Sequence, residues 1–234
     1  MSEKIREITF LSELDNTMQP AFFAPASGSE PRPLVVKMIL DRGFDLIGQM
    51  MIGLPGSDFE SELQTARFIV SSGAKGARIY PTVVFRETEL CDMTLKGAYK
   101  PLTVEEAVER SAKVLEIFID AGIEVIRIGL QASEGLRDDE SYFAGPNHSA
   151  LGEMVIGEVY YSKILNKLSE MNISDKDNIT VLVSVGSLSK AIGQKRRNKI
   201  RLSEQYKNIR FAESAEISGY EVLVNITNGE MKCT

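Results

Sequence analysis

The chain has 234 residues, 43% of them hydrophobic and 26% charged, which is enough for one large domain or two small ones. No apolar run reaches the roughly 18 residues of a membrane span. The N-terminus, MSEKIREITF, mixes both charge signs where a signal peptide would be apolar. The sequence therefore predicts a cytoplasmic protein with no membrane partner.

Cysteine and histidine are too scarce for most metal sites. Cys91 and Cys233 lie far apart and cannot form a disulfide framework, which argues against export. The single histidine, His148, excludes a site that needs two imidazoles. We expect no metal site built from this chain alone.

Residues 1–33 are predicted to be irregular, because the four prolines between residues 20 and 33 oppose both helix and central strand. Residues 34–146 then alternate helix and strand, which predicts parallel β/α units. The predicted strands are 45–54, 76–85 and 123–130, and the main helices are 34–43, 58–73 and 104–121. Three strands are too few to close a barrel, so the fold class is α/β with a partial, TIM-like half-barrel.

Short signals mark the ends of these elements. Residues 55–58 form a turn that ends in the helix N-cap Asp58, and Thr103-x-x-Glu106 is a capping box for the long helix. Pro81 must lie at the end of its strand or at a bulge.

Residues 147–234 predict a separate small α/β domain. A helix at 151–171 precedes a strand at 180–186, a short helix at 187–192, the loop GQKR and a helix at 197–206. Two further strands follow, at 208–213 and 220–226. The chain is therefore divided into 1–33, 34–146 and 147–234.

Four segments follow one another between residues 49 and 131: QMMIGLPGSDFESELQTARFI, RIYPTVVFRETEL, KGAYKPLTVEEAVE and VIRIGLQ. In order and spacing they resemble the second half of the radical S-adenosylmethionine (SAM) domain of the Elongator catalytic subunit and its bacterial relatives. For complete relatives this implies modification of a tRNA wobble uridine, with SAM and a [4Fe–4S] cluster as cofactors. No acetyltransferase domain follows in this chain.

The end of the first strand is the predicted ligand site, since α/β folds bind ligands at the carboxyl ends of parallel strands. Glycines there let a flat ring approach, and free backbone N–H and C=O groups would bond its edge. The resemblance implies that this strand end holds the adenine of SAM and that the next strand lines the same pocket. The implied residues are Met51, Gly53, Leu54, Pro55, Gly56, Arg78, Tyr80 and Pro81. Alternatively, Gly53 and Gly56 only shape a turn.

The chain departs from the family at the cluster. Radical SAM enzymes bind the [4Fe–4S] cluster through a CxxxCxxC loop, and this sequence has none, so we expect no bound iron. It is then a truncated product, a subdomain, or one half of a split enzyme completed by an N-terminal half-chain. A non-catalytic RNA-binding or scaffold protein is the alternative. A bare edge at 45–53 would predict a homodimer, or cover by residues 1–33.

His148 follows a polar loop in the stretch AGPNHSALGEMV, and the bacterial relatives carry a comparable Gly-Pro-x-His stretch. Histidine often acts as a general acid or base, which makes His148 a catalytic candidate. The alternative is a solvated histidine at a helix start.

Between residues 187 and 210 there are eight basic residues and one acid, a net +7 in a chain of −6, which leaves −13 for the remainder. The segment resembles a KH-type RNA-binding core whose GxxG loop is degenerate. The residues expected to contact tRNA or another RNA are Gly193, Gln194, Lys195, Arg196, Arg197, Lys199 and Arg201. We expect Lys195 and Arg196 to be exposed, and Ile192 and Ile200 to be core. A solvated basic helix is the alternative.

Overall fold

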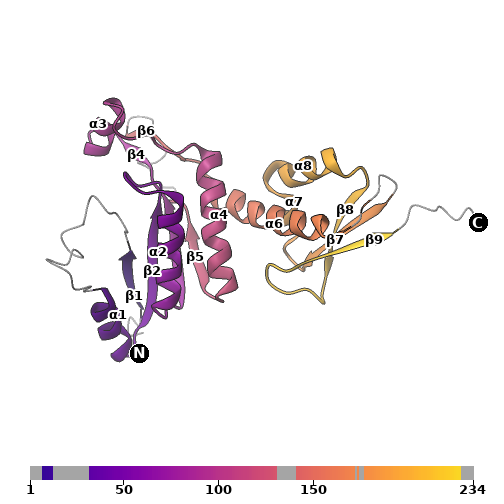
Figure 1. Cartoon of the computed structure of the whole chain (residues 1–234), viewed down its shortest axis with the longest axis horizontal. Coiled ribbons are helices and arrows are strands. Elements are labelled where there is room, and N and C mark those ends of the chain that lie inside the picture. The colour runs from indigo at the N-terminus through magenta and orange to yellow at the C-terminus, as the bar shows by residue number, and fades with distance from the viewer. Residues whose placement is uncertain (1–6, 13–31, 131–140, 172, 174–176, 228–234) are drawn as a thin grey trace, which may run out of the picture. The chain divides into compact units, whose positions relative to one another are not determined.

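The structure is a computed structural model that describes residues 7–12, 32–130, 141–171, 173 and 177–227 (Figure 1). The chain divides into two compact units, Met1–Leu151 and Gly152–Thr234. Each unit combines helices with its own sheets, so the predicted mixed α/β class is confirmed. Within the described residues, no helix is both long enough and apolar enough to cross a bilayer.

A four-stranded parallel sheet organises the first unit. In the order β1-β2-β3-β5 it contains β1 (Glu7–Ser12), β2 (Asp45–Ile52), β3 (Gly76–Pro81) and β5 (Glu124–Ile128). The crossovers between successive strands contain α1 (Arg32–Asp41), α2 (Phe59–Ser71) and α4 (Val104–Asp120). Three strands and three helices are therefore confirmed between residues 34 and 130, as is their parallel β/α connection. The strand predicted at 76–85 is shorter than expected, since it ends at Pro81 and residues 84–85 belong to another sheet.

The prediction that residues 1–33 are irregular is wrong at β1. Glu7–Ser12 pairs in parallel with the first six residues of β2. All four prolines that motivated the prediction follow residue 19, so they do not oppose an extended backbone at β1. Because β1 pairs with β2, it covers the strand edge at 45–53 that was predicted to be exposed unless a second copy or residues 1–33 covered it. Residues 13–31 lie outside the described part of the chain.

Helices α2 and α4 pack against one face of the sheet (Figure 1). Gly48 in β2 permits this close packing, because a Cβ there would lie 2.3 Å from Cγ2 of Ile69 in α2. The core of this face is formed by Met50, Ile52, Ala66, Ile69, Ala77, Ile79, Val114, Leu115 and Phe118. Close packing on this face fixes where the carboxyl ends of β2 and β3 lie.

The predicted end signals of these elements are confirmed. The Asp58 side chain accepts the Ser61 N–H at 2.8 Å and begins α2, and Thr103 with Glu106 forms the same kind of capping box at α4. Pro81 is the last residue of β3. The sequence does not predict the small antiparallel sheet in which β6 (Tyr142–Ala144) pairs with β4 (Val84–Phe85), because β6 lies in a polar stretch whose glycine and proline favour a loop. Helix α3 (Glu89–Leu95) packs against β4.

The second unit has a three-stranded sheet in the order β8-β7-β9. Central strand β7 (Asn178–Ser184) is parallel to β8 (Ile209–Ser214) and antiparallel to β9 (Val222–Thr227). Helix α6 (Leu151–Ser169) precedes the sheet, and α7 (Leu188–Ile192), η1 (Gln194–Arg196) and α8 (Arg197–Gln205) connect β7 to β8. The core includes Tyr160, Ile164, Leu168, Val181 and Leu202. The separate small sheet agrees with the sequence, and the KH-type assignment stays a prediction.

Candidate functional site

The strand ends of the first unit present a row of half-buried side chains. Successive side chains of a strand point to opposite faces, so Gln49 and Met51 of β2 lie on the face opposite the one that α2 covers. Met51 is in register with Tyr80 of β3, and Gln49 is in register with Arg78. The row therefore places a thioether beside a phenol ring and an amide beside a cation, next to the carboxyl ends of β2 and β3.

The turn that follows β2, Gly53–Asp58, is held by the protein itself. Gly53 has φ +79° and donates its N–H to Oε1 of Glu62 at 2.6 Å, while its C=O accepts the Tyr99 hydroxyl at 2.6 Å. The N–H of Gly53 is therefore not free for a ligand and its C=O already accepts one hydrogen bond, and a role of Gly53 in ligand binding stays a prediction. A Cβ at Gly53 would also lie 2.6 Å from Cδ1 of Leu102, so the close approach that this glycine permits is to Leu102.

The carboxylate of Glu62 is the buried charge of this region. The Glu62 side chain is 2% exposed and forms an ion pair with Arg110 of α4. Its Oε2 lies 2.8 Å from Nε of Arg110, and its Oε1 lies 2.6 Å from Nη2. Burial raises the pKa of the Glu62 carboxyl, and the Gly53 N–H and the Arg110 charge oppose that shift. The sequence does not predict Glu62, Tyr99 and Arg110 as site residues. Their spacing along the chain gives no local signal for the hydrogen bonds and the ion pair that link them to Gly53 and to each other.

His148 caps a turn in this structure. Its Nδ1 accepts the Ala150 N–H at 3.1 Å and its C=O accepts the Leu151 N–H at 3.0 Å, immediately before α6. The ring is half-buried. Because Nδ1 accepts a hydrogen bond, the neutral ring carries its proton on Nε2. These contacts agree with a histidine at a helix start, and a catalytic role stays a prediction.

The cysteines of this chain do not fit an iron–sulfur cluster. Cys91 is free and buried in α3, in an apolar cluster with Val84 and Tyr99, and Cys233 lies outside the described residues. Two thiolates cannot supply the three that a CxxxCxxC loop provides. Among the residues that the structure describes, no cluster of three or more His, Cys, Asp or Glu side chains could hold a metal ion.

The basic segment of the second unit forms a loop with an unusual backbone. Lys195 has φ +51° and Arg196 has φ +62°, a left-handed conformation that non-glycine residues rarely adopt. Buried Asn198 anchors the loop, donating from Nδ2 to the carbonyls of Gly157 at 2.7 Å and Ala191 at 3.1 Å. A Cβ at Gly193 would lie 2.9 Å from Cγ of Asn198, which explains the glycine there.

The predicted RNA-contacting residues differ in exposure. Lys195 and Arg196 are exposed as expected, Gln194, Arg197 and Lys199 are half-buried, and Gly193 is buried. Arg201 instead packs on α6, where it pairs with Glu158 at 2.7 Å and lies 3.5 Å from the ring centre of Tyr161.

The expectation that Ile200 is core is wrong, because its side chain is 56% exposed. Ile192 is half-buried. The inward positions of α8 are Asn198 and Leu202, four residues apart, which places Ile200 on the opposite side. Ile200 lines a hollow of about 410 Å³ together with Arg196, Lys199, Ser203 and Glu204.

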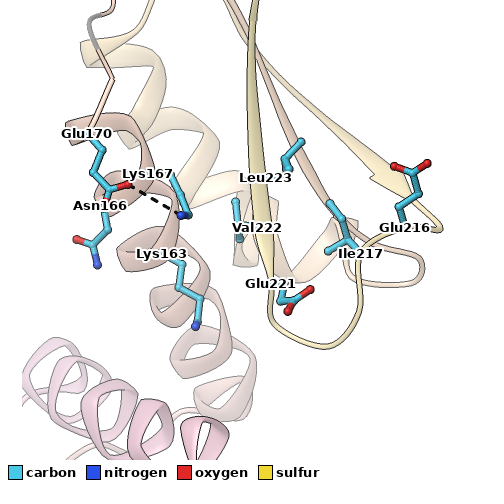
Figure 2. A pocket seen from close by; sticks show the side chains of 9 residues that line it. All are labelled: Lys163, Asn166, Lys167, Glu170, Glu216, Ile217, Glu221, Val222 and Leu223. Atoms are coloured by element: carbon cyan, nitrogen blue, oxygen red, sulfur yellow. Dashed lines mark ion pairs between the residues drawn. The ribbon is translucent and has the colours of Figure 1, made fainter.

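A second hollow, of about 520 Å³, lies between α6 and the β8–β9 connection (Figure 2). Figure 2 shows Lys163 and Lys167 on the α6 side and Glu216 and Glu221 on the other. Lys167 lies 3.9 Å from Glu170, which directly follows α6. Since both signs of charge line this hollow, it is a poor surface for a polyanion such as RNA.

Comparisons with known proteins agree with the resemblance seen in the sequence. The family model described as the radical SAM C-terminal domain matches residues 74–161, from the start of β3 into α6. A tRNA uridine(34) acetyltransferase of Methanocaldococcus jannaschii is 34% identical over 76 residues, and Elongator complex protein 3 of Drosophila melanogaster is 32% identical over 80 residues. An uncharacterised M. jannaschii protein is 31% identical over 85 residues.

These similarities cover only part of each protein. The aligned region is 31% to 35% of this chain, 26% of the uncharacterised relative and 14% of the other two. The solved structure of Elp3 from Methanocaldococcus infernus with residues 1–46 deleted is 25% identical, with a TM-score of 0.45, and the match covers 59% of this chain and 36% of that one.

Proposed function

The chain carries a radical SAM C-terminal-like region at residues 74–161, and from this premise we propose that its first unit binds the adenosyl part of S-adenosylmethionine. The observation that supports this proposal is the pairing of Met51 with Tyr80 beside the Gly53 turn, at the carboxyl ends of β2 and β3. Both side chains are half-buried, so they offer apolar surface to a flat ring.

Titration calorimetry with SAM and with S-adenosylhomocysteine tests this proposal. Met51→Ala should weaken binding about tenfold, because burial of a methionine side chain against a ligand contributes on the order of 1.4 kcal/mol. Met93→Ala is the matched control, since Met93 is also half-buried but packs against the cluster around Cys91. Absence of SAM binding by the wild type, or equal weakening by both variants, would contradict the proposal.

We propose further that the second unit contacts RNA through its basic loop and the first residues of α8, which together are residues 193–201. Lys195 and Arg196 are exposed on a loop whose shape Asn198 fixes, and Lys199 lies one helical turn further along. Phosphate groups would meet these cations without base recognition, since no aromatic residue lies in this segment. The relatives named as tRNA uridine(34) acetyltransferases make tRNA the first RNA to examine.

Filter binding of tRNA hairpins at two salt concentrations tests the RNA contact. Reversal of Lys195 and Arg196 to glutamate should abolish binding, and binding by the wild type should weaken steeply from the lower to the higher salt concentration. Reversal of Lys163 and Lys167, which line the mixed-charge hollow, is the control with the same charge change in the same unit. RNA binding without SAM binding would favour the alternative function, a non-catalytic RNA-binding protein.

A further inference from the structure

The backbone of Gly53 is held by two side chains, one from α2 and one from the connection between α3 and α4. Its N–H donates to Glu62 and its C=O accepts the Tyr99 hydroxyl, both at 2.6 Å. The side chain of Leu102 fills the space beside its Cα. The N–H and the C=O of Gly53, which belong to two successive peptide groups, therefore both have partners in the protein, and neither peptide group can rotate without breaking a buried hydrogen bond.

Glu62 connects both ends of the turn to α4. In addition to the Gly53 N–H, its Oε1 accepts the hydroxyl of Ser57 at 3.3 Å, and both of its oxygens contact the guanidinium of Arg110. A buried ion pair is seldom the most stabilising way to fill a core, because both charges lose water. Its location here, with one carboxylate contacting Gly53 and Ser57, is instead well suited to fix the shape of the turn.

Tyr99 supplies the other half of the clamp. The residue is 9% exposed and lies between α3 and α4, and its hydroxyl donates to a carbonyl 46 residues away. Burial raises the pKa of Tyr99 to about 12, so the hydroxyl remains a donor at neutral pH. The turn is thus held from α2, from α4 and from the connection between α3 and α4.

We propose that Glu62, Tyr99 and Arg110 are positioning residues that preorganise the Gly53–Ser57 turn for ligand binding. They act through the turn and do not touch the ligand. This inference rests on the proposed function, since the ligand is taken to be SAM. Preorganisation of this kind raises affinity because the turn loses little freedom when the ligand binds.

Tyr99→Phe tests the proposal with a matched control, Tyr142→Phe. The Tyr142 hydroxyl also donates to a glycine carbonyl of the first unit, that of Gly145 at 2.8 Å, but not to the turn. We expect Tyr99→Phe to weaken SAM binding about fivefold in calorimetry, as for one lost hydrogen bond, and Tyr142→Phe to leave it within about twofold. Both variants should shift the melting temperature by similar amounts. Equal affinities for the two variants would overturn the proposal.

Amide hydrogen exchange separates this proposal from the function it rests on. Tyr99→Phe and Glu62→Gln should each speed exchange in residues 53–57 about fivefold relative to Tyr142→Phe, whether or not SAM binds. If the wild type binds no SAM but exchange in these residues speeds up, the proposed function fails and the clamp of the turn stands. If exchange in both variants matches that of the control, the positioning role is refuted, even where Glu62→Gln lowers stability through its half-buried partner Arg110.

Discussion

The substitution Asn198→Ala should destabilise the second unit and release the basic loop. Asn198 is 2% exposed, and its Nδ2 donates to the carbonyls of Gly157 in α6 and Ala191 in α7. Each lost hydrogen bond costs about 1 kcal/mol, and each carbonyl left unsatisfied adds to that loss. We therefore expect the free energy of unfolding of this unit to fall by about 2 to 4 kcal/mol.

Asn198→Asp is the sharper version of this test. The carboxylate has nearly the same shape as the amide, but at neutral pH it presents an acceptor to two carbonyls, so two attractive contacts become repulsive. The loss should therefore exceed that of Asn198→Ala. Asn166→Ala, at an exposed position of α6, is the control and should change stability by less than about 0.5 kcal/mol.

Urea unfolding, monitored by hydrogen exchange in peptides that contain β7, would measure the loss of free energy of unfolding in the second unit. Fluorescence is less suitable, because the chain has no tryptophan. The same variants should bind RNA more weakly than their stability alone explains, since the loop with Lys195 and Arg196 would lose its anchor. If Asn198→Ala is as stable as Asn166→Ala, the amide does not hold α6, α7 and the loop together, and this reasoning is refuted.

Three further predictions concern packing and titration. Leu202→Ala should lower the free energy of unfolding by about 2 to 5 kcal/mol because the Leu202 side chain is fully buried, whereas Ile200→Ala should lower it by less than about 0.5 kcal/mol. Equal losses in urea unfolding would contradict the assignment of Leu202 to the buried side of α8 and Ile200 to the exposed side. Gly48→Ala should lower the free energy of unfolding by about 1 to 3 kcal/mol, because the added methyl group would clash with Ile69. The second substitution Ile69→Val should recover part of that loss, and a double variant no more stable than Gly48→Ala would contradict this contact. The backbone N–H of Ser61 holds the pKa of the Asp58 carboxyl below its usual 3.8. The stabilisation that the ionised carboxyl gives to the folded state is therefore present above pH 3.8, and it is lost as the pH falls through the folded-state pKa. The stability advantage over Asp58→Asn should therefore vanish in acid, and a pH-independent difference would exclude ionisation as its source.

Local signals were sufficient for most elements of this protein. The capping boxes at Asp58 and Thr103 each involve only four consecutive residues. Pro81 ends β3 because it has no N–H to donate to a neighbouring strand. Alternation of apolar runs with amphipathic helices predicted the parallel β/α units and the separate small sheet. These features depend on neighbours along the chain, so the sequence by itself determined them.

Only the tertiary structure decided the contacts between distant residues. Glu62 meets Arg110 across 48 positions and Tyr99 meets Gly53 across 46, so no short pattern could show that the N–H and the C=O of Gly53 already have partners. At α8 the apolar residue Ile200 faces outward and the polar residue Asn198 faces inward, contrary to hydropathy. Asn198 tolerates burial because two backbone carbonyls accept its hydrogen bonds, and those acceptors come from α6 and α7. A buried polar group is stable only with such partners, and folding alone brings them together.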